Sequence, residues 1–546
     1  MSKIIYKILI LFSAVLLLSS CEDLMNTHPS TDVDKSVILK DAESVRVAMN
    51  GVYSTMYNRI DFVTANAHQC FGNMAVILAA ELMGEDMVQT AEGAGWFWHD
   101  YNYEVRERYT SKIQRCYFTW KYFYELINNV NYILSVEDSA SGDKDELAYL
   151  MAQAYSVRAY SYFMLIQSFQ QTYMGHEDFP GVPVYTEPTL STSKGKGRGT
   201  VQDVYDQIIK DLDKAFDLYI SCGKSQEHIT ELDYYAACML RARVALVMND
   251  WETAAEAARE VQKKPGRTLL SMSDATVVKG RFNDADKSWT TGRTPFNSVS
   301  SSSVIWGAEV LTEQSTVYAS FYSQMDACTD LYYAAESPKC ISNWLYDQIS
   351  VTDVRKGWWN GNIGIPASSW KYGANIDYNQ HKFQWADQKS FKGDYIFMRL
   401  EEAYLIEAEA ECRLGNYDKA KAALMEVGSR RDTKYAARIA NLTGSEQTFG
   451  STGSVTTLLD EILLQRRIEL WGETGRIYDI LRQGKGWTRY WEVKGEKTNH
   501  SNWLSKYSEY LNFPPDFLEC ILMIPQNEID NNPNISNADQ NPYIQR

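Results

Sequence analysis

Two segments of the chain share a helix–break–helix pattern, which constrains the fold more than any other feature of the sequence. Residues 232–263 form one copy, interrupted at Asn249-Asp250, and residues 394–430 form the other, interrupted at Gly415-Asn416. Small or apolar residues recur at the same offsets of twelve and four in both copies: Ala242, Ala254 and Ala258 in the first, and Ala408, Ala420 and Leu424 in the second. Because small side chains let antiparallel helices approach closely, each segment is predicted to form a helical hairpin.

This pattern resembles the tetratricopeptide repeat, in which small residues line the contact between two antiparallel helices. Arg241 and Glu407 stand where that repeat prefers leucine, so generic helical hairpins of similar length stay open as the alternative. The two copies are far apart in sequence, and a simple tandem array is therefore not expected.

Helical periodicity covers much of the remaining chain. Large residues recur at spacings of three and four over residues 112–136 and 146–169, and residues 201–219 follow Thr200, an expected N-cap with Asp203 at the capping-box position. The predicted fold class is mostly α. A tetratricopeptide-repeat-like helical scaffold is expected over residues 36–263 and 394–546, with a loop-rich, Trp-rich ligand-binding part between them.

The intervening segment, residues 264–393, is rich in Ser, Thr, Gly and Asn. It nevertheless carries seven of the fifteen tryptophans: Trp289, Trp306, Trp344, Trp358, Trp359, Trp370 and Trp385. Tryptophans in loop-rich sequence either pack large rings against a scaffold or present them to a ligand.

The N-terminus has the features of an export signal. Lys3 and Lys7 precede an apolar run over residues 8–18, which would rise only about 16 Å as a helix, too little to span a bilayer. The following Leu18-Ser19-Ser20-Cys21 resembles a bacterial lipobox, so residues 1–20 are expected to be removed and Cys21 to carry the lipid. Residues 21–35 are polar and are interpreted as a flexible tether. An ordinary signal followed by an incidental cysteine is the alternative.

Composition limits the class of partner. The formal net charge of −16 argues against nucleic acid and anionic lipid as partners. The cysteines are scattered without a Cys-x-x-Cys pair; Cys328 and Cys340 could form a disulfide, which spacing alone does not establish.

No catalytic motif is recognisable in the sequence. It contains neither a His-Glu-x-x-His pair nor a Gly-x-Ser-x-Gly elbow, and the carboxylates of Glu81, Glu85 and Asp86 are interpreted as a solvated helix end. We therefore expect a protein that is not an enzyme and needs no cofactor; a structural calcium ion is not indicated by the sequence.

Three C-terminal motifs carry a family resemblance. They are Arg399-Leu400-Glu401-Glu402-Ala403-Tyr404 with the helix that it opens, Gln465-Arg466-Arg467-Ile468-Glu469-Leu470-Trp471 running on to Arg476, and the tail Met523-Ile524-Pro525-Gln526-Asn527-Glu528. Together with the lipobox, they resemble the SusD/RagB family of outer-membrane lipoproteins. From the residues themselves, Arg466, Arg467, Glu469 and Arg476 are predicted to form charge pairs that lock the last helix onto the repeats.

The resemblance implies a location and partners. It implies a lipid-anchored protein on the outer face of the outer membrane, which acts with a SusC-like TonB-dependent transporter and captures nutrients, typically glycans. Glu22-Asp23, directly after the lipidated cysteine, resembles the export signal of such lipoproteins.

Exposed aromatic rings with polar neighbours are the expected platform for sugars. The expected ligand-binding residues on the first wall are Trp96, Trp98, Asp86, Tyr101 and Asn102, and those on the second wall are Trp289, Trp358, Trp359 and Trp370. Alternation along Trp96-Phe97-Trp98 predicts that the two tryptophans share a face.

Two other functions stay open beside glycan binding. One is capture of peptides or protein fragments on the same scaffold, as the RagB branch of the family implies. The other is a secreted hydrolase, which would need paired catalytic carboxylates that the sequence does not reveal.

Overall fold

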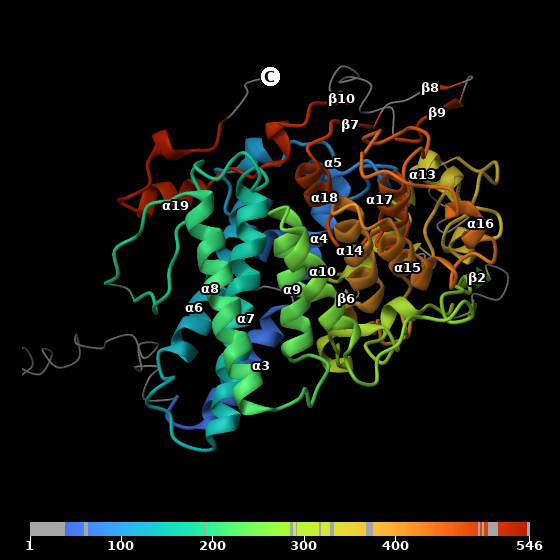
Figure 1. Ribbon diagram of the computed structural model, residues 1–546. Helices are drawn as coiled ribbons and strands as arrows, with labels where there is room; N and C mark the ends of the chain where they lie inside the picture. The colour runs from blue at the N-terminus through green and yellow to red at the C-terminus, as the bar shows by residue number, and fades with distance from the viewer. Residues whose placement is uncertain are drawn as a thin grey trace, which may run out of the picture.

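The computed structural model describes most of the chain. The described residues are 39–58, 64–190, 192–283, 288–290, 292–315, 318–327, 332–366, 375–489, 492–493, 496–500 and 512–542. Cys21 and the expected signal and tether lie outside them. Within these ranges the protein is mostly helical, which confirms the predicted fold class (Figure 1). None of the described helices is both long and apolar enough to cross a bilayer.

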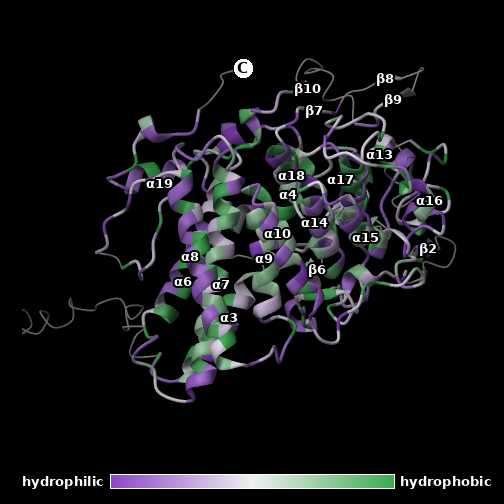
Figure 2. Ribbon diagram, in the orientation of Figure 1, coloured by the Kyte–Doolittle hydropathy of each residue, from purple (hydrophilic) through white to green (hydrophobic). Residues whose placement is uncertain are grey.

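Four long helices form one side of the molecule (Figure 1): α3 (Ala42–Thr55), α6 (Arg115–Leu134), α7 (Lys144–Phe169) and α8 (Val201–Cys222). Helix α7 contacts α3, α6 and α8, so nearly all of its side chains are buried. Helix α8 buries only a stripe at spacings of three and four, and its two-toned colouring in Figure 2 reflects that pattern. Thr200 and Asp203 form the predicted capping box.

The two predicted hairpins pack against each other in space. They consist of α9 (Tyr234–Val247) with α10 (Trp251–Gln262), and α14 (Leu400–Arg413) with α15 (Tyr417–Gly428). Helix α10 contacts α14, and all six residues at the shared offsets are fully buried. The Glu407 carboxylate, at a position where leucine was preferred, accepts hydrogen bonds across this contact from Arg259 (3.4 Å) and Gln262 (2.6 Å).

The second hairpin begins later than its sequence pattern predicts. Residues 395–399 form strand β6 (Tyr395–Arg399), which pairs antiparallel with β4 (Val304–Ala308), and α14 starts at Leu400. The prediction of helix from residue 394 was wrong because Tyr395, Ile396 and Phe397 suit a strand, and β4 from the preceding segment satisfies their backbone.

The centre is built around α4 (Asn73–Met83), whose eleven residues are all buried. Helix α18 (Arg476–Gln483) contacts α4, and α17 (Leu458–Glu469) contacts α14. Strand β1 (Met87–Gln89) follows α4 and pairs with β5 (Lys339–Ile341), which joins the intervening segment to this centre.

The remaining elements are short. They are α5 (Trp98–Tyr101), α11 (Phe321–Met325), α12 (Tyr332–Glu336), α13 (Asn343–Gln348), α16 (Tyr435–Ile439), α19 (Gln526–Asn531), β2 (Arg281–Asn283), β3 (Ser288–Thr290), β7 (Trp487–Thr488), β8 (Glu492–Val493), β9 (Glu496–Lys497) and β10 (Asn512–Phe513). The C-terminal segment runs over the top of the molecule in Figure 1, from β10 to α19.

Candidate functional site

Asp86 belongs to a buried ion-pair cluster between α4 and the C-terminal helices. Its carboxylate accepts hydrogen bonds from the Arg467 guanidinium (2.6 and 2.9 Å) and lies 3.1 Å from Arg476 Nε, while its side chain is 1% exposed. Glu85 joins the cluster at 2.8 Å from Arg476 Nη2. Asp86 therefore binds arginines in this structure and does not face solvent, where a sugar hydroxyl could reach it. Arg467 and Arg476 thus form ion pairs, as the sequence predicts, but these pairs join α17 and α18 to the end of α4 and not to the repeats.

The same helix end was expected to be solvated, and that interpretation is wrong. Glu81, Glu85 and Asp86 are all buried. The Glu81 carboxylate accepts hydrogen bonds from the backbone N–H groups of Thr474 (3.2 Å) and Gly475 (2.8 Å), and burial raises the pKa of this carboxyl to about 7. The error arose because the groups that cover the helix end lie nearly four hundred residues further along the chain.

Trp98 and Tyr101 are also buried. Their rings lie 5.7 Å apart, and the Tyr101 hydroxyl is 2.9 Å from Nδ1 of His500. Asn102 is half-buried and caps α5 with its backbone. The predicted alternation fails because Phe97 has a left-handed φ of 61° and Trp98 begins α5, so the chain is not extended there. Trp96 and Trp98 consequently pack against different partners.

The second expected wall is not a row of exposed rings. Trp358 and Trp359 are 0% and 1% exposed, so the expectation that they are exposed was wrong. Trp358 donates its indole N–H to the Ala275 carbonyl at 2.7 Å, and Trp359 lies 5.6 Å from Trp471. Burying rings of this size stabilises a loop-rich segment that has little regular secondary structure.

Two members of that wall have no described side chain. Trp289 lies on β3, opposite Phe282 of β2, and only its backbone is described. Trp370 lies outside the described residues. Ligand binding by these two residues stays a prediction.

Trp96 is the one sequence-predicted tryptophan with a described, partly exposed ring. It lies in a loop after Gly93 and Gly95, both with positive φ, and its ring centroid is 4.8 Å from that of His68 and 5.9 Å from that of Tyr333. Tyr318 is 46% exposed, and its ring centroid lies 6.0 Å from that of His68 and 6.2 Å from that of Tyr333. We call His68, Trp96, Tyr318 and Tyr333 the aromatic cluster.

The aromatic cluster combines ring faces with polar edges. The Tyr333 hydroxyl is 3.1 Å from His68 Nδ1, which fixes both rings. The Trp96 indole nitrogen is buried and has no acceptor among the described residues, whereas the Trp96 backbone carbonyl accepts a hydrogen bond from Gln89 Nε2 at 3.1 Å. The partly exposed rings of such a site can stack on the C–H face of a sugar.

Sequence reasoning missed three of these four residues. His68, Tyr318 and Tyr333 come from three separate segments, and none has a motif around it. Their only common signal is an aromatic or imidazole ring in irregular sequence, which many other residues of this chain share. Tertiary contact alone brings them to Trp96.

The described residues contain no group of three or more His, Cys, Asp or Glu side chains arranged to hold a metal ion. Cys340 has a buried thiol that is free among the described residues, and Cys328, its possible disulfide partner, lies outside them.

The chain belongs to the SusD family. Residues 39–246 match the family model described as "Starch-binding associating with outer membrane", and residues 366–543 match the model described as the SusD family. The resemblance found in the C-terminal motifs is thereby confirmed.

Individual relatives are distant but extend over nearly the whole chain. A SusD-like protein of Formosa agariphila is 21% identical over 518 residues, covering 88% of this chain and 90% of its own. A crystal structure of a SusD-like carbohydrate binding protein from Bacteroides vulgatus is 21% identical, with a TM-score of 0.69, covering 93% of this chain and 99% of its own. A crystal structure of a SusD superfamily protein from Bacteroides thetaiotaomicron is 24% identical, with a TM-score of 0.70, covering 92% of this chain and 100% of its own. These structures share the fold of this chain.

Proposed function

We propose that this protein is a non-catalytic glycan-binding lipoprotein of the cell surface. In this proposal it binds an oligosaccharide or polysaccharide at the aromatic cluster and delivers it to a SusC-like TonB-dependent transporter of the outer membrane. The observation that carries the proposal is the half-exposed arrangement of His68, Trp96, Tyr318 and Tyr333. Rings held at different angles suit a curved chain of sugars better than they suit a single flat ligand.

Family membership supports the ligand class. The matching family model is described as starch-binding and associated with the outer membrane, and one solved relative is described as carbohydrate binding. Peptide binding on the same scaffold, the RagB-like alternative, uses rings as well, so the experiment must offer both ligands.

Isothermal titration of the mature chain against a panel of polysaccharides and peptides tests this function. We expect a glycan to bind, and Trp96→Ala and Tyr318→Ala each to weaken that binding about tenfold or more, because each removes a stacked ring. The matched control is Phe179→Ala, which removes another half-exposed ring far along the sequence from the cluster. Binding of peptides alone, or full glycan affinity in both cluster variants, would refute the proposal.

A further inference from the structure

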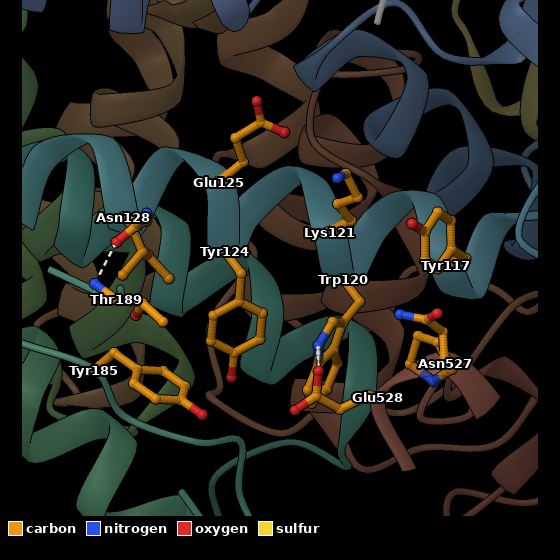
Figure 3. A pocket seen from close by; sticks show the side chains of 12 residues that line it. Tyr117, Trp120, Lys121, Tyr124, Glu125, Asn128, Tyr185, Thr189, Asn527 and Glu528 are labelled. Carbon is orange, nitrogen blue, oxygen red and sulfur yellow. Dashed lines mark hydrogen bonds between the residues drawn. The ribbon is translucent and has the colours of Figure 1, made fainter. Parts of the chain in front are cut away.

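A cavity of about 410 Å³ lies outside the aromatic cluster and shares none of its residues. It is bounded by α6, by the loop that includes Tyr185 and Thr189, and by the C-terminal segment at Asn527 and Glu528 (Figure 3). Its volume falls within the range of about 300 to 1,000 Å³ that is typical of small-molecule sites.

Helix α6 presents an aromatic stripe to this cavity. Tyr117, Trp120, Tyr124 and Asn128 follow one another at spacings of three and four on the side that lines it. Trp120 is buried, with its ring centroid 4.9 Å from that of Phe169 in the core, and Tyr124 packs against the same core, whereas Tyr117 is half-buried. The Trp120 and Tyr124 rings therefore pack against the core on one side and line the cavity on the other.

The rings are held in fixed orientations. The Tyr124 hydroxyl donates to the Pro183 carbonyl at 2.8 Å, and the Tyr185 hydroxyl accepts from the Lys196 backbone N–H at 2.9 Å. The Tyr124 and Tyr185 rings lie 5.8 Å apart at 84°, so they form a corner (Figure 3). Trp120 lies 4.9 Å from Tyr124 and donates its indole N–H to Glu528 Oε2 at 3.2 Å. A ligand would therefore meet platforms that are already ordered.

The polar groups around the rings have mixed character. Lys121 supplies a cation, Glu125 and Glu528 supply carboxylates, and Asn128 and Asn527 supply amides. An ionic ligand is best matched by groups of one charge, whereas hydroxyls both donate and accept and are matched by such a mixture.

We propose that this cavity is a second saccharide-binding site, which takes a single pyranose ring or the end of a glycan chain against the Tyr124–Tyr185 corner. The inference relies on the proposed function for the class of ligand, but it concerns a separate site. Two sites on one lipid-anchored body would raise the avidity for a polymer that can span both.

The test measures saturation-transfer NMR in the Trp96→Ala background, so that the aromatic cluster contributes little. The probes are the methyl glycosides of glucose, mannose and galactose. We expect transfer from at least one of them, and its loss on adding Thr189→Trp, which fills the cavity from an exposed position without removing a described side-chain hydrogen bond. Asn527→Trp fills the cavity from the opposite wall and should also abolish the transfer.

The matched control is Glu187→Trp, an exposed position in the same loop that does not line the cavity. It should leave transfer unchanged, and thermal melting verifies that each variant is folded. Absence of transfer from all three glycosides, or transfer that survives both filling variants, would overturn the proposal. Loss of association with the transporter partner in the filling variants, without any saccharide signal, would also overturn it and assign the cavity to a protein contact. Because the panel titration relies on Trp96 and Tyr318, the two sites can fail independently.

Discussion

Three guanidinium groups surround the carboxylate of Glu469 inside the protein. Arg431 Nη2 and Arg399 Nη1 lie 2.9 and 3.3 Å from its Oε1, and Arg355 Nη1 lies 3.2 Å from its Oε2. Burial alone would raise the pKa of Glu469, but the three guanidinium charges hold this pKa well below its usual range. A buried charge of this kind persists because its partners are buried with it, and it links the intervening segment to β6, to the chain after α15 and to α17.

Glu81 shows the opposite balance, and its stability contribution should depend on pH. Burial raises its pKa to about 7, while the unfolded chain titrates near the ordinary value of 4.5. Stability from this proton is therefore fully present below about pH 4.5 and is lost as the pH rises through about 7.

The change that tests this is Glu81→Gln, which keeps an uncharged acceptor in place. The free energy of unfolding of the variant minus that of the natural protein should rise by about 2 kcal/mol from pH 5 to pH 8, because only the natural protein loses the stability that this proton provides. Denaturant titrations at both pH values measure this, with Glu43→Gln as an exposed control on α3. Parallel behaviour of the Glu81 variant and the natural protein at both pH values would contradict the assignment.

At the scale of elements, the small residues of the hairpins decide how closely helices approach. Ala408 on α14 is fully buried in a small core with Ala420 and Leu424 of α15. The sequence predicted this contact because its offsets recur in both hairpins. It could not predict that α10 and α14 pack together, since the helices are separated by residues 263–399 and no local pattern encodes such a pairing.

We expect Ala408→Leu to lower the free energy of unfolding by about 1–3 kcal/mol, because the larger side chain must push α14 and α15 apart. Leucine is a good helix former, so the helix itself is not the cause of the loss. The matched control is Ala422→Leu on the exposed side of α15, which should change stability little. Equal stability of the two variants, measured by denaturant unfolding, would show that the contact tolerates larger residues.

At the scale of the whole molecule, the expected anchor determines where the protein acts. Attachment through acyl chains contributes about 0.8 kcal/mol per buried CH₂, so several chains give a durable anchor. We predict that Cys21→Ser moves the protein from the membrane fraction to the soluble fraction and abolishes its labelling by a fatty-acid analogue. Cys222→Ser, at a half-buried thiol in the folded body, is the control and should remain in the membrane fraction. Retention of the Cys21 variant in the membrane would point to another means of attachment.

The sequence alone determined the helical class, the positions of most long helices and the family. These follow from local information, because periodicity, N-caps and short motifs each involve residues within a turn or two of one another. It also predicted the ion pairs of the arginines in the C-terminal helices, and it proposed Trp96 as a ligand-binding residue, which stays a prediction. Local sequence did not determine whether each aromatic ring is buried or exposed. Trp358 and Trp359 became core, and Trp96 met His68, Tyr318 and Tyr333, only when distant segments packed together.

Asp86 illustrates the same limit. As part of a sequence it is an acidic residue after a helix, equally suited to a ligand or to an ion pair. Its partner Arg467 lies 381 residues further along the chain, and the contact with Arg467 helps to bury Asp86. Hydrophobic pattern and capping are read along the chain, whereas burial and charge pairing depend on which surfaces meet, so the tertiary structure alone decided which groups remain available to a ligand.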